Sequence, residues 1–235
     1  TLFLCAFFQE SHKMNTAEKD KQVKSRKRVA DHGEVFTNIR EVNAMLDLVK
    51  DQTERIDATF LEPACGTGNF LIEILRRKLN VINDKYSKSR DEYDANLIKA
   101  TTSIYGVELL PDNTQECRDR LYKEIHNQYP KTFNRDDAFH QLMRSVKYIL
   151  DTNIICGDAL NYTTESGEPI VFTEWKFIND TDVKRRCFDY QVVLDKTKQL
   201  SLFGDDGEQA HIPQHGTEFP PTHYLKLADH DTEQT

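Results

Sequence analysis

Residues 60–71 read Phe-Leu-Glu-Pro-Ala-Cys-Gly-Thr-Gly-Asn-Phe-Leu, and they join a short apolar run to a glycine turn and then to an apolar helix. Glycines at positions 66 and 68 allow backbone angles closed to other residues, and they let a ligand approach the main chain. The helix that follows offers unpaired N–H groups at its start. This order of elements predicts a binding site for a nucleotide-type cofactor. The alternative is a purely structural turn between a strand and a helix.

An acidic residue, Glu62, ends the strand just before this turn. In dinucleotide sites and phosphate-binding loops the ligand beyond the turn is a phosphate, which a neighbouring carboxylate would repel. The acid therefore favours a cationic or neutral ligand.

The sequence of residues 62–71 resembles the cofactor motif of S-adenosylmethionine-dependent DNA methyltransferases that modify the adenine amino group. The resemblance implies that Glu62 faces the methionine amino group, that the glycine loop passes under the cofactor, and that Phe70 packs near it. It needs no metal. The cofactor-binding candidates in this motif are Glu62, Ala64, Gly66, Gly68, Asn69 and Phe70.

A second motif precedes the first strand at residues 32–37, His-Gly-Glu-Val-Phe-Thr. It resembles the family segment that contacts the methionine end of the cofactor, and Thr37 is the implied contact. The family normally continues with proline, whereas this chain has Asn38. The segment also suits an ordinary helix start, because Val42, Leu46 and their neighbours follow a helical period.

Residues 103–109, Ser-Ile-Tyr-Gly-Val-Glu-Leu, form a second predicted strand that ends in an acid. A carboxylate there can accept hydrogen bonds from both hydroxyls of a ribose, which makes Glu108 the ribose candidate. The alternative is a surface acid at a strand end. In a simple strand–helix–strand unit that acid follows the loop by about 20 residues. The distance is larger here, so we expect an extra helix around residues 93–97.

A helix should follow Glu108, with Asp112 and Gln115 as its capping box. The next helix, over residues 139–150, has the clearest apolar period in the chain. It leads to a third strand and to Gly157-Asp158-Ala159-Leu160. The resemblance implies that Asp158 accepts a hydrogen bond from the cofactor's adenine and that Ala159 lies beside it. An aspartate after glycine is also a common turn residue.

The fold expected is a three-layer α/β sandwich of the Rossmann-like class I methyltransferase type, incomplete, with flexible termini. Its fourth strand is predicted over residues 188–194. The family's catalytic motif, Asn or Asp followed by Pro-Pro and an aromatic, is absent after it, and Asp195 is the weak candidate for a catalytic residue. The proline pair at 220–221 is interpreted as part of a linker.

The 235-residue chain carries a net charge of −8, which is unexpected for a protein that holds a polyanion. Much of the acidity lies after residue 204, where seven acids face Lys226 alone. A basic run over residues 19–28 would either lie along a phosphate backbone or form a solvated end. Five scattered cysteines suit a reducing, cytoplasmic compartment, and the apolar residues 1–8 are too few to span a membrane.

The acidic end contains Gln199-Leu200-Ser201-Leu202-Phe203, which resembles the peptide by which bacterial proteins bind the replicative sliding clamp. Apolar anchors on a polar tail can enter a partner groove. The alternative is a strand that completes the local sheet. The implied clamp contacts are Gln199, Leu200, Leu202 and Phe203.

We expect three regions. Residues 1–30 form a flexible basic segment, in which 1–13 are interpreted as preceding the natural start; residues 31–198 form the methyltransferase-like domain; residues 199–235 form an acidic flexible tail. The predicted function is an adenine-specific DNA methyltransferase, or its cofactor-binding subunit, from a restriction–modification or mobile-element context. A second subunit would supply target recognition and the catalytic motif. The alternatives are a non-catalytic, DNA-associated binding module tethered to the clamp, and a methyltransferase for RNA or a small molecule.

Overall fold

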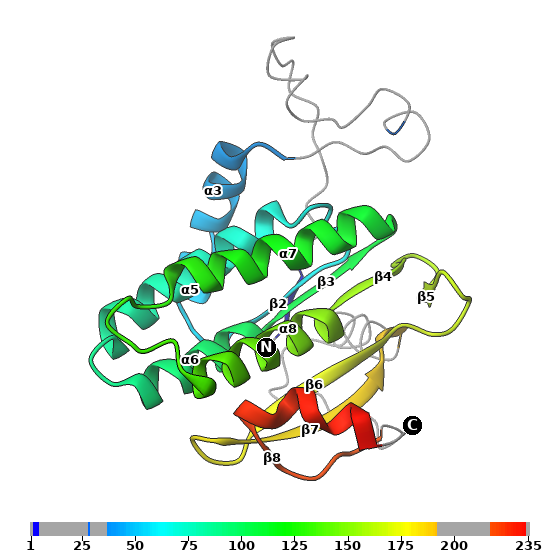
Figure 1. The fold of residues 1–235 in the computed structure, drawn as a ribbon. Coiled ribbons are helices and arrows are strands. Elements are labelled where there is room, and N and C mark those ends of the chain that lie inside the picture. Colours follow the sequence, from blue (N-terminus) through cyan, green and yellow to red (C-terminus); the bar gives the residue numbers. More distant parts are fainter. Residues whose placement is uncertain (1, 5–27, 29–36, 192–216, 234–235) are drawn as a thin grey trace, which may run out of the picture.

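The protein is described by a computed structural model at residues 2–4, 28, 37–191 and 217–233. These residues form a mixed α/β fold around a five-stranded sheet in the order β1-β2-β3-β4-β5 (Figure 1). The first four strands are parallel, and β5 pairs antiparallel with β4. The bounds are β1 Leu2–Leu4, β2 Thr59–Glu62, β3 Ile104–Glu108, β4 Ile154–Asp158 and β5 Thr163–Thr164. The predicted α/β class with a mostly parallel sheet is confirmed.

The central strand β3 is buried along its whole length. A strand covered on both faces reads as a continuous apolar run, and Ile104-Tyr105-Gly106-Val107 is such a run. Gly106 is required by packing, because a Cβ there would lie 2.9 Å from the Sγ of Cys65 and 3.0 Å from Leu71. The glycine therefore lets the loop and the helix after β2 lie directly on the sheet.

Two helices connect β2 to β3, and two more connect β3 to β4. Helices α5 and α6 form the first connection, and α7 and α8 form the second. Helix α6 is the extra helix that the sequence spacing predicted. The bounds are α5 Asn69–Tyr86, α6 Arg90–Thr102, α7 Pro111–Gln128 and α8 Asp137–Asn153.

A short helix, α3 (Ile39–Asp47), packs on β2 and α5 through Val42 and Leu46, and α4 (Lys50–Thr53) follows it. Asn38 caps α3, because its Oδ1 accepts a hydrogen bond from the Arg40 amide at 2.9 Å. The residue that departs from the family's proline is thus a favourable helix cap.

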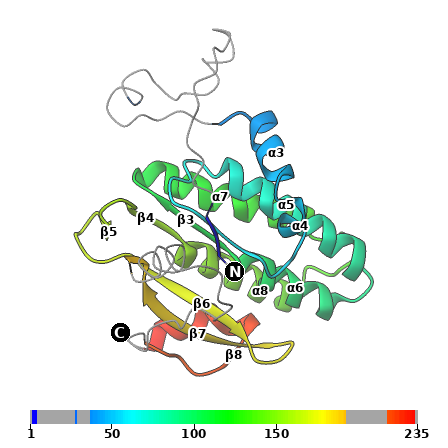
Figure 2. The same ribbon diagram turned by 180° about the vertical axis from the view of Figure 1, so that it is seen from behind.

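A small antiparallel sheet covers the face of the central sheet that carries Leu61, Tyr105 and Val107 (Figures 1 and 2). Its strands are β6 Val171–Phe177, β7 Asp182–Asp189 and β8 Thr222–His223. The Tyr105 hydroxyl donates to the Thr173 carbonyl at 2.7 Å across the interface. Within the described residues, this sheet takes the place of the helical layer expected on the second face.

The predicted fourth parallel strand, residues 188–194, is therefore wrong where the structure describes it. Strand β7 ends at Asp189 and pairs with β6, not with the central sheet. The reason is a tight turn, in which the Asn179 Oδ1 accepts from the amides of Thr181 at 2.9 Å and Asp182 at 2.7 Å. This Asx turn folds the chain back on itself, so residues 182–189 pair locally with β6.

The expected flexible tail is ordered in part. Residues 217–223 lie along β7, and the 3₁₀ segment η1 (Tyr224–Glu233) packs on α8 with Tyr224 and Leu227 buried. Phe219, next to the proline pair, stacks on the guanidinium of Arg185 with 4.5 Å between that group and the ring centroid. The interpretation of the proline pair as a linker is therefore wrong.

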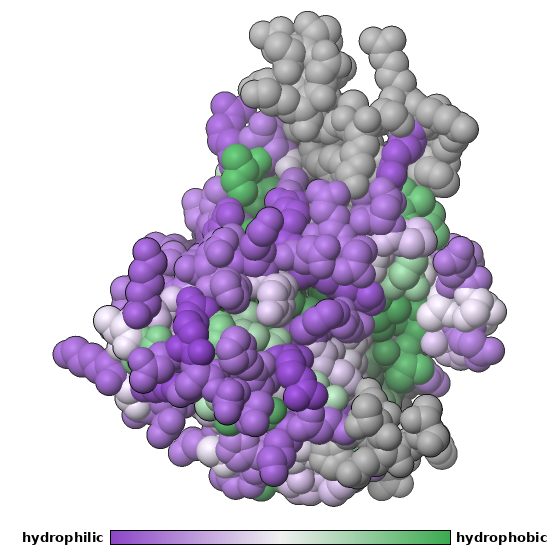
Figure 3. Space-filling view, in the orientation of Figure 1, coloured by the Kyte–Doolittle hydropathy of each residue, from purple (hydrophilic) through white to green (hydrophobic). Residues whose placement is uncertain are grey.

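The surface over α5 and α7 is largely hydrophilic (Figure 3). No helix among the described residues is long and apolar enough to cross a membrane. Asp195, the clamp-like peptide at 199–203 and the basic run, except for Arg28, lie outside the described residues.

Candidate cofactor site

Three acids end three neighbouring parallel strands. Glu62 is the last residue of β2, Glu108 of β3 and Asp158 of β4. In register, Glu62 pairs with Gly106, and Glu108 pairs with Cys156. Because the strands are parallel, the acids lie at one edge of the sheet, where ligands of open α/β sheets bind. The sequence predicted Glu62 and Glu108 correctly as strand ends, whereas the third strand was expected to end at Cys156 and extends two residues farther, to Asp158.

The glycine turn begins at the same edge. The Cys65 amide donates to the Val107 carbonyl at 3.0 Å, which holds the first part of the turn on β3. Gly66 has a φ of 54° and Gly68 a φ of 87°, values that favour glycine strongly. Gly68 is the N-cap of α5 and supplies no side-chain acceptor to the first turn of this helix.

Glu108 holds the glycine loop. Its Oε2 accepts from the Gly66 amide at 2.9 Å, and its Oε1 accepts from the Leu110 amide at 3.1 Å and from the Asn113 side chain at 3.3 Å. A carboxylate has about four acceptor positions, so three of them are used here. One position remains, which suits a single ribose hydroxyl better than the two that the sequence suggested.

Of the three strand-end acids, Glu62 has the fewest hydrogen bonds among the described residues to offset its burial. Its side chain is 8% exposed, and its Oε2 has no hydrogen-bond partner among the described residues. Burial raises the pKa of Glu62 to about 8, against the smaller lowering by its hydrogen bond from the Ala64 amide. An oxygen of this kind is costly to leave unpaired. A cation beside it would stabilise the ionised form.

Thr37, the described end of the second motif, contacts the start of α5. The Asn69 side-chain amide donates to the Thr37 carbonyl at 3.0 Å. The same Asn69 accepts at Oδ1 from Arg120 of α7 at 3.0 Å. Thr37, Asn69 and the loop are thus brought together, with the backbone of Thr37 in contact.

Asp158 forms the turn that the sequence offered as its alternative role. Its Oδ1 accepts from the amides of Leu160 at 2.8 Å and Asn161 at 3.2 Å, and its Oδ2 accepts from the Asn161 side chain at 2.7 Å. These amide bonds hold the pKa of Asp158 below its ordinary value. Ala159 packs against the core between the two sheets.

Phe70 and Ala64 occupy different surroundings. Phe70 is half-buried and packs against the cluster that contains Val42 and Phe60, on the side of α3. Ala64 is exposed in the turn. Phe70 therefore links the start of α5 to α3. The part of the loop around Ala64 is exposed at the protein surface.

Two apolar residues at the strand ends were missed by the sequence reasoning. Leu109 follows Glu108 and is 53% exposed, and Leu160 follows the Asp158 turn and is 87% exposed. Large apolar side chains so exposed next to polar strand ends suit contact with a flat ring. The sequence signal that could have identified them is their position, one residue after Glu108 and two residues after Asp158.

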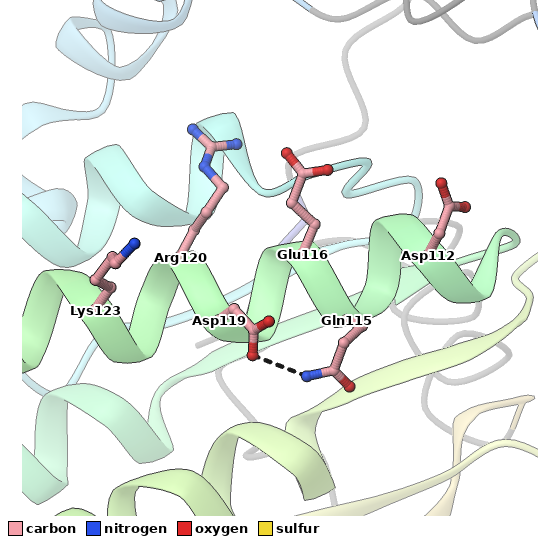
Figure 4. Close-up of a pocket in the computed structure, with 6 residues that line it drawn as sticks. All are labelled: Asp112, Gln115, Glu116, Asp119, Arg120 and Lys123. Atoms are coloured by element: carbon pink, nitrogen blue, oxygen red, sulfur yellow. Dashed lines mark hydrogen bonds between the residues drawn. The ribbon is translucent and has the colours of Figure 1, made fainter.

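A surface depression of about 500 Å³ lies beside α7, lined by six polar residues that include Arg120 (Figure 4). None of the strand-end acids lines it. The predicted capping box at the start of α7 is wrong, because Leu110 is the N-cap and makes no side-chain bond. Asp112 instead pairs with Arg28 at 2.6 Å, and Gln115 donates to Asp119 at 2.8 Å.

Among the described residues, no cluster of histidine, cysteine or acidic side chains has the arrangement of a metal site. Comparison of the chain with protein-family models, with curated proteins and with solved structures found no match. The functional argument therefore depends on the site residues themselves.

Proposed function

We propose that the chain is an adenine-specific DNA methyltransferase, or its S-adenosylmethionine-binding subunit, in a restriction–modification or mobile-element context. The observation that carries the proposal is the buried, partly unpaired Glu62 at the start of the glycine turn. A cation at that position would stabilise the ionised carboxylate, and the sequence of residues 62–71 resembles a site in which this cation is the methionine ammonium of S-adenosylmethionine. Glu108, at the end of the next strand, suits the ribose of the same ligand.

Each described candidate would then have one role. Glu62 binds the methionine ammonium, Glu108 binds a ribose hydroxyl, and the N-terminal end of α5 lies toward the methionine carboxylate. Leu109 and Leu160 would contact the adenine ring, and Asp158 would orient the turn beside its amino group. S-adenosylmethionine supplies a methyl group on a sulfonium, and a flipped-out adenine amine would displace that sulfur directly.

The group that would hold the adenine amine is not among the described residues. Asp195 and the residues around it lie outside them. Because the sequence contains no Asn or Asp followed by Pro-Pro and an aromatic, we propose a second subunit that contributes the catalytic motif and target recognition, with DNA as the common substrate. The four described cysteines are free thiols, which suits the cytoplasmic location that we propose.

A second candidate function is a non-catalytic, DNA-associated module that holds the cofactor and is tethered to the sliding clamp through residues 199–203. One observation favours it. Phe188 and Asp189, which begin the strand expected to lead to the catalytic motif, pair in a separate antiparallel sheet. A pull-down with purified clamp tests the tether, comparing the wild type with a Gln199→Ala, Phe203→Ala double variant. Equal retention of the two proteins would exclude clamp binding through this peptide.

Calorimetric titration with S-adenosylmethionine tests the cofactor site. We expect the wild type to bind and Glu108→Ala to bind at least tenfold more weakly. An absence of binding by the wild type would refute the cofactor assignment. Transfer of a labelled methyl group to DNA, with and without the products of neighbouring genes, tests catalysis. Transfer in no combination would favour the binding module.

A further inference from the structure

Arg120 of α7 contacts the glycine loop at three acceptors. Its NH1 lies 2.6 Å from the Thr67 carbonyl oxygen, 2.9 Å from the Thr67 hydroxyl and 3.0 Å from the Asn69 Oδ1. Thr67 is buried between the two left-handed glycines. Figure 4 shows Arg120 pointing from α7 toward the chain that begins α5. One guanidinium nitrogen thus joins both residues that flank Gly68.

The contact also fixes the orientation of the Asn69 amide group. Because Arg120 donates to Oδ1, the Nδ2 of Asn69 is directed to the Thr37 carbonyl, which it reaches at 3.0 Å. Arg120, Asn69 and Thr37 therefore form a chain of hydrogen bonds across three segments that are distant in the sequence. The loop is linked in this way to α7 and to the segment before α3.

Helix polarity gives no reason for a cation here. The N-terminal end of a helix carries partial positive charge, which disfavours an arginine beside the start of α5. The arginine is held instead by the carbonyl, hydroxyl and amide oxygens of the loop. Glycines lose more conformational freedom on ordering than other residues, so a loop with two of them needs such contacts to keep its amides in place.

We propose that Arg120 is a positioning residue for the cofactor loop, and that it acts through Thr67 and Asn69 without touching the cofactor. The inference rests on the proposed binding of S-adenosylmethionine. Arg120 reduces the entropy that the loop would otherwise lose when the ligand binds. Its loss should therefore weaken cofactor affinity more than it weakens the fold.

The chain offers a matched control in Arg76 of α5. Arg76 pairs with Glu124 of α7 through two bonds of 2.9 Å, so it joins the same two helices farther from the loop. Arg76→Met removes an interhelical arginine of the same size. We expect it to lower Tm and to leave the Kd for S-adenosylmethionine within about twofold of the wild type.

The test compares Arg120→Met, Arg120→Lys and Arg76→Met by calorimetry and by hydrogen exchange of the amides of residues 66–70. We expect Arg120→Met to raise the Kd by about 10- to 100-fold, as for lost bonds to a charged group. Its loop amides should exchange faster than those of Arg76→Met. Arg120→Lys should recover part of the affinity, because an ammonium can donate to the Thr67 carbonyl.

The outcomes separate the two proposals. If the wild type binds the cofactor and Arg120→Met binds it as tightly, the positioning role is overturned and the cofactor site stands. An Arg120→Met affinity that falls only as far as that of Arg76→Met would also overturn it. If the wild type does not bind, the proposed function fails, and the positioning role fails with it.

Discussion

The Gly66 amide donates a hydrogen bond to the Oε2 of Glu108 over 2.9 Å, across 42 residues of sequence. The glycine loop and the acid that ends the second predicted strand are separate motifs in the sequence. In the structure they form one hydrogen-bonded unit. Any ligand that uses Glu108 also meets a loop whose position depends on the same carboxylate.

Replacing Glu108 should therefore affect both stability and binding. Glu108→Ala removes the acceptor of three donors, and we expect a loss of about 2–4 kcal/mol in the free energy of unfolding. Glu108→Gln keeps one oxygen for the Gly66 amide but brings a donor toward Leu110 or Asn113. Its loss should be smaller, about 1–2 kcal/mol. Urea unfolding measures both, and equal stability of the alanine variant and the wild type would contradict the structural role.

Gly68 should tolerate alanine poorly for two separable reasons. Its φ of 87° is unfavourable for other residues, and an added Cβ would lie 2.6 Å from the Sγ of Cys117. We expect Gly68→Ala to cost about 2–4 kcal/mol, from backbone strain and overpacking together. Gly167 is the control, because its φ is 84° and nothing lies within 4 Å of its Cβ position.

Gly167→Ala should cost only the backbone term, about 1–2 kcal/mol. In a Cys117→Ala background, the cost of Gly68→Ala should fall toward that value. Thermal or urea unfolding of the wild type, the three single variants and the Cys117→Ala, Gly68→Ala double variant gives the comparison. If Gly68→Ala costs no more than Gly167→Ala, the steric argument is incorrect.

Much of the first half of the fold could be predicted because its signals are local. The apolar runs of β2, β3 and β4, the turn glycines and the period of α8 are all read within short windows. The spacing between Gly68 and Glu108 even predicted α6. The antiparallel sheet was not predicted, since an apolar run such as the one that begins at Phe188 looks the same whether it follows a strand of a hairpin or forms a strand of a parallel sheet. The Asn179 turn was the local sign of the hairpin.

The contacts of the site were harder to predict than its residues. Arg120 lies in a polar helix, and its partners are 51 and 53 residues earlier. No periodicity marks such a residue. The unpaired oxygen of Glu62 is likewise a property of three-dimensional burial, which a sequence pattern does not contain.

Buried Lys78 of α5 should give the protein a distinct pH dependence. Its ammonium donates to the Ala58 carbonyl at 2.5 Å, to the Ile56 carbonyl at 3.3 Å and to the Ser103 hydroxyl. Burial lowers the pKa of Lys78 from 10.5 to about 7. Between these values the folded state binds fewer protons than the unfolded state, so the lysine makes stability rise with pH.

The free energy of unfolding of the wild type minus that of Lys78→Met should therefore increase with pH from 7 to 9.5, by up to about 1.4 kcal/mol per pH unit. Taking the difference cancels the titration of other groups. A difference that stays constant over this range would mean that Lys78 titrates normally in the folded protein.

Glu62 should produce the opposite dependence in the free protein. Its folded pKa of about 8 lies above the ordinary value of 4.5, so the folded state holds a proton that the unfolded state releases. The contribution to stability is complete below pH 4.5 and is lost as the pH rises through 8. Glu62→Gln removes the titration, and its stability relative to wild type should increase across this window, measured by urea unfolding at each pH.

If S-adenosylmethionine binds as proposed, the same carboxyl should make its binding release a proton. A cation beside Glu62 favours the ionised form, so at pH 6.0–7.5, where the free protein keeps Glu62 protonated, binding of S-adenosylmethionine should release close to one proton. Affinity should rise by up to tenfold per pH unit. Calorimetry in two buffers of different ionisation enthalpy measures the proton number directly. Glu62→Gln should bind more weakly and release none, and a wild type that binds without releasing a proton would show that the ligand's cation does not lie at Glu62.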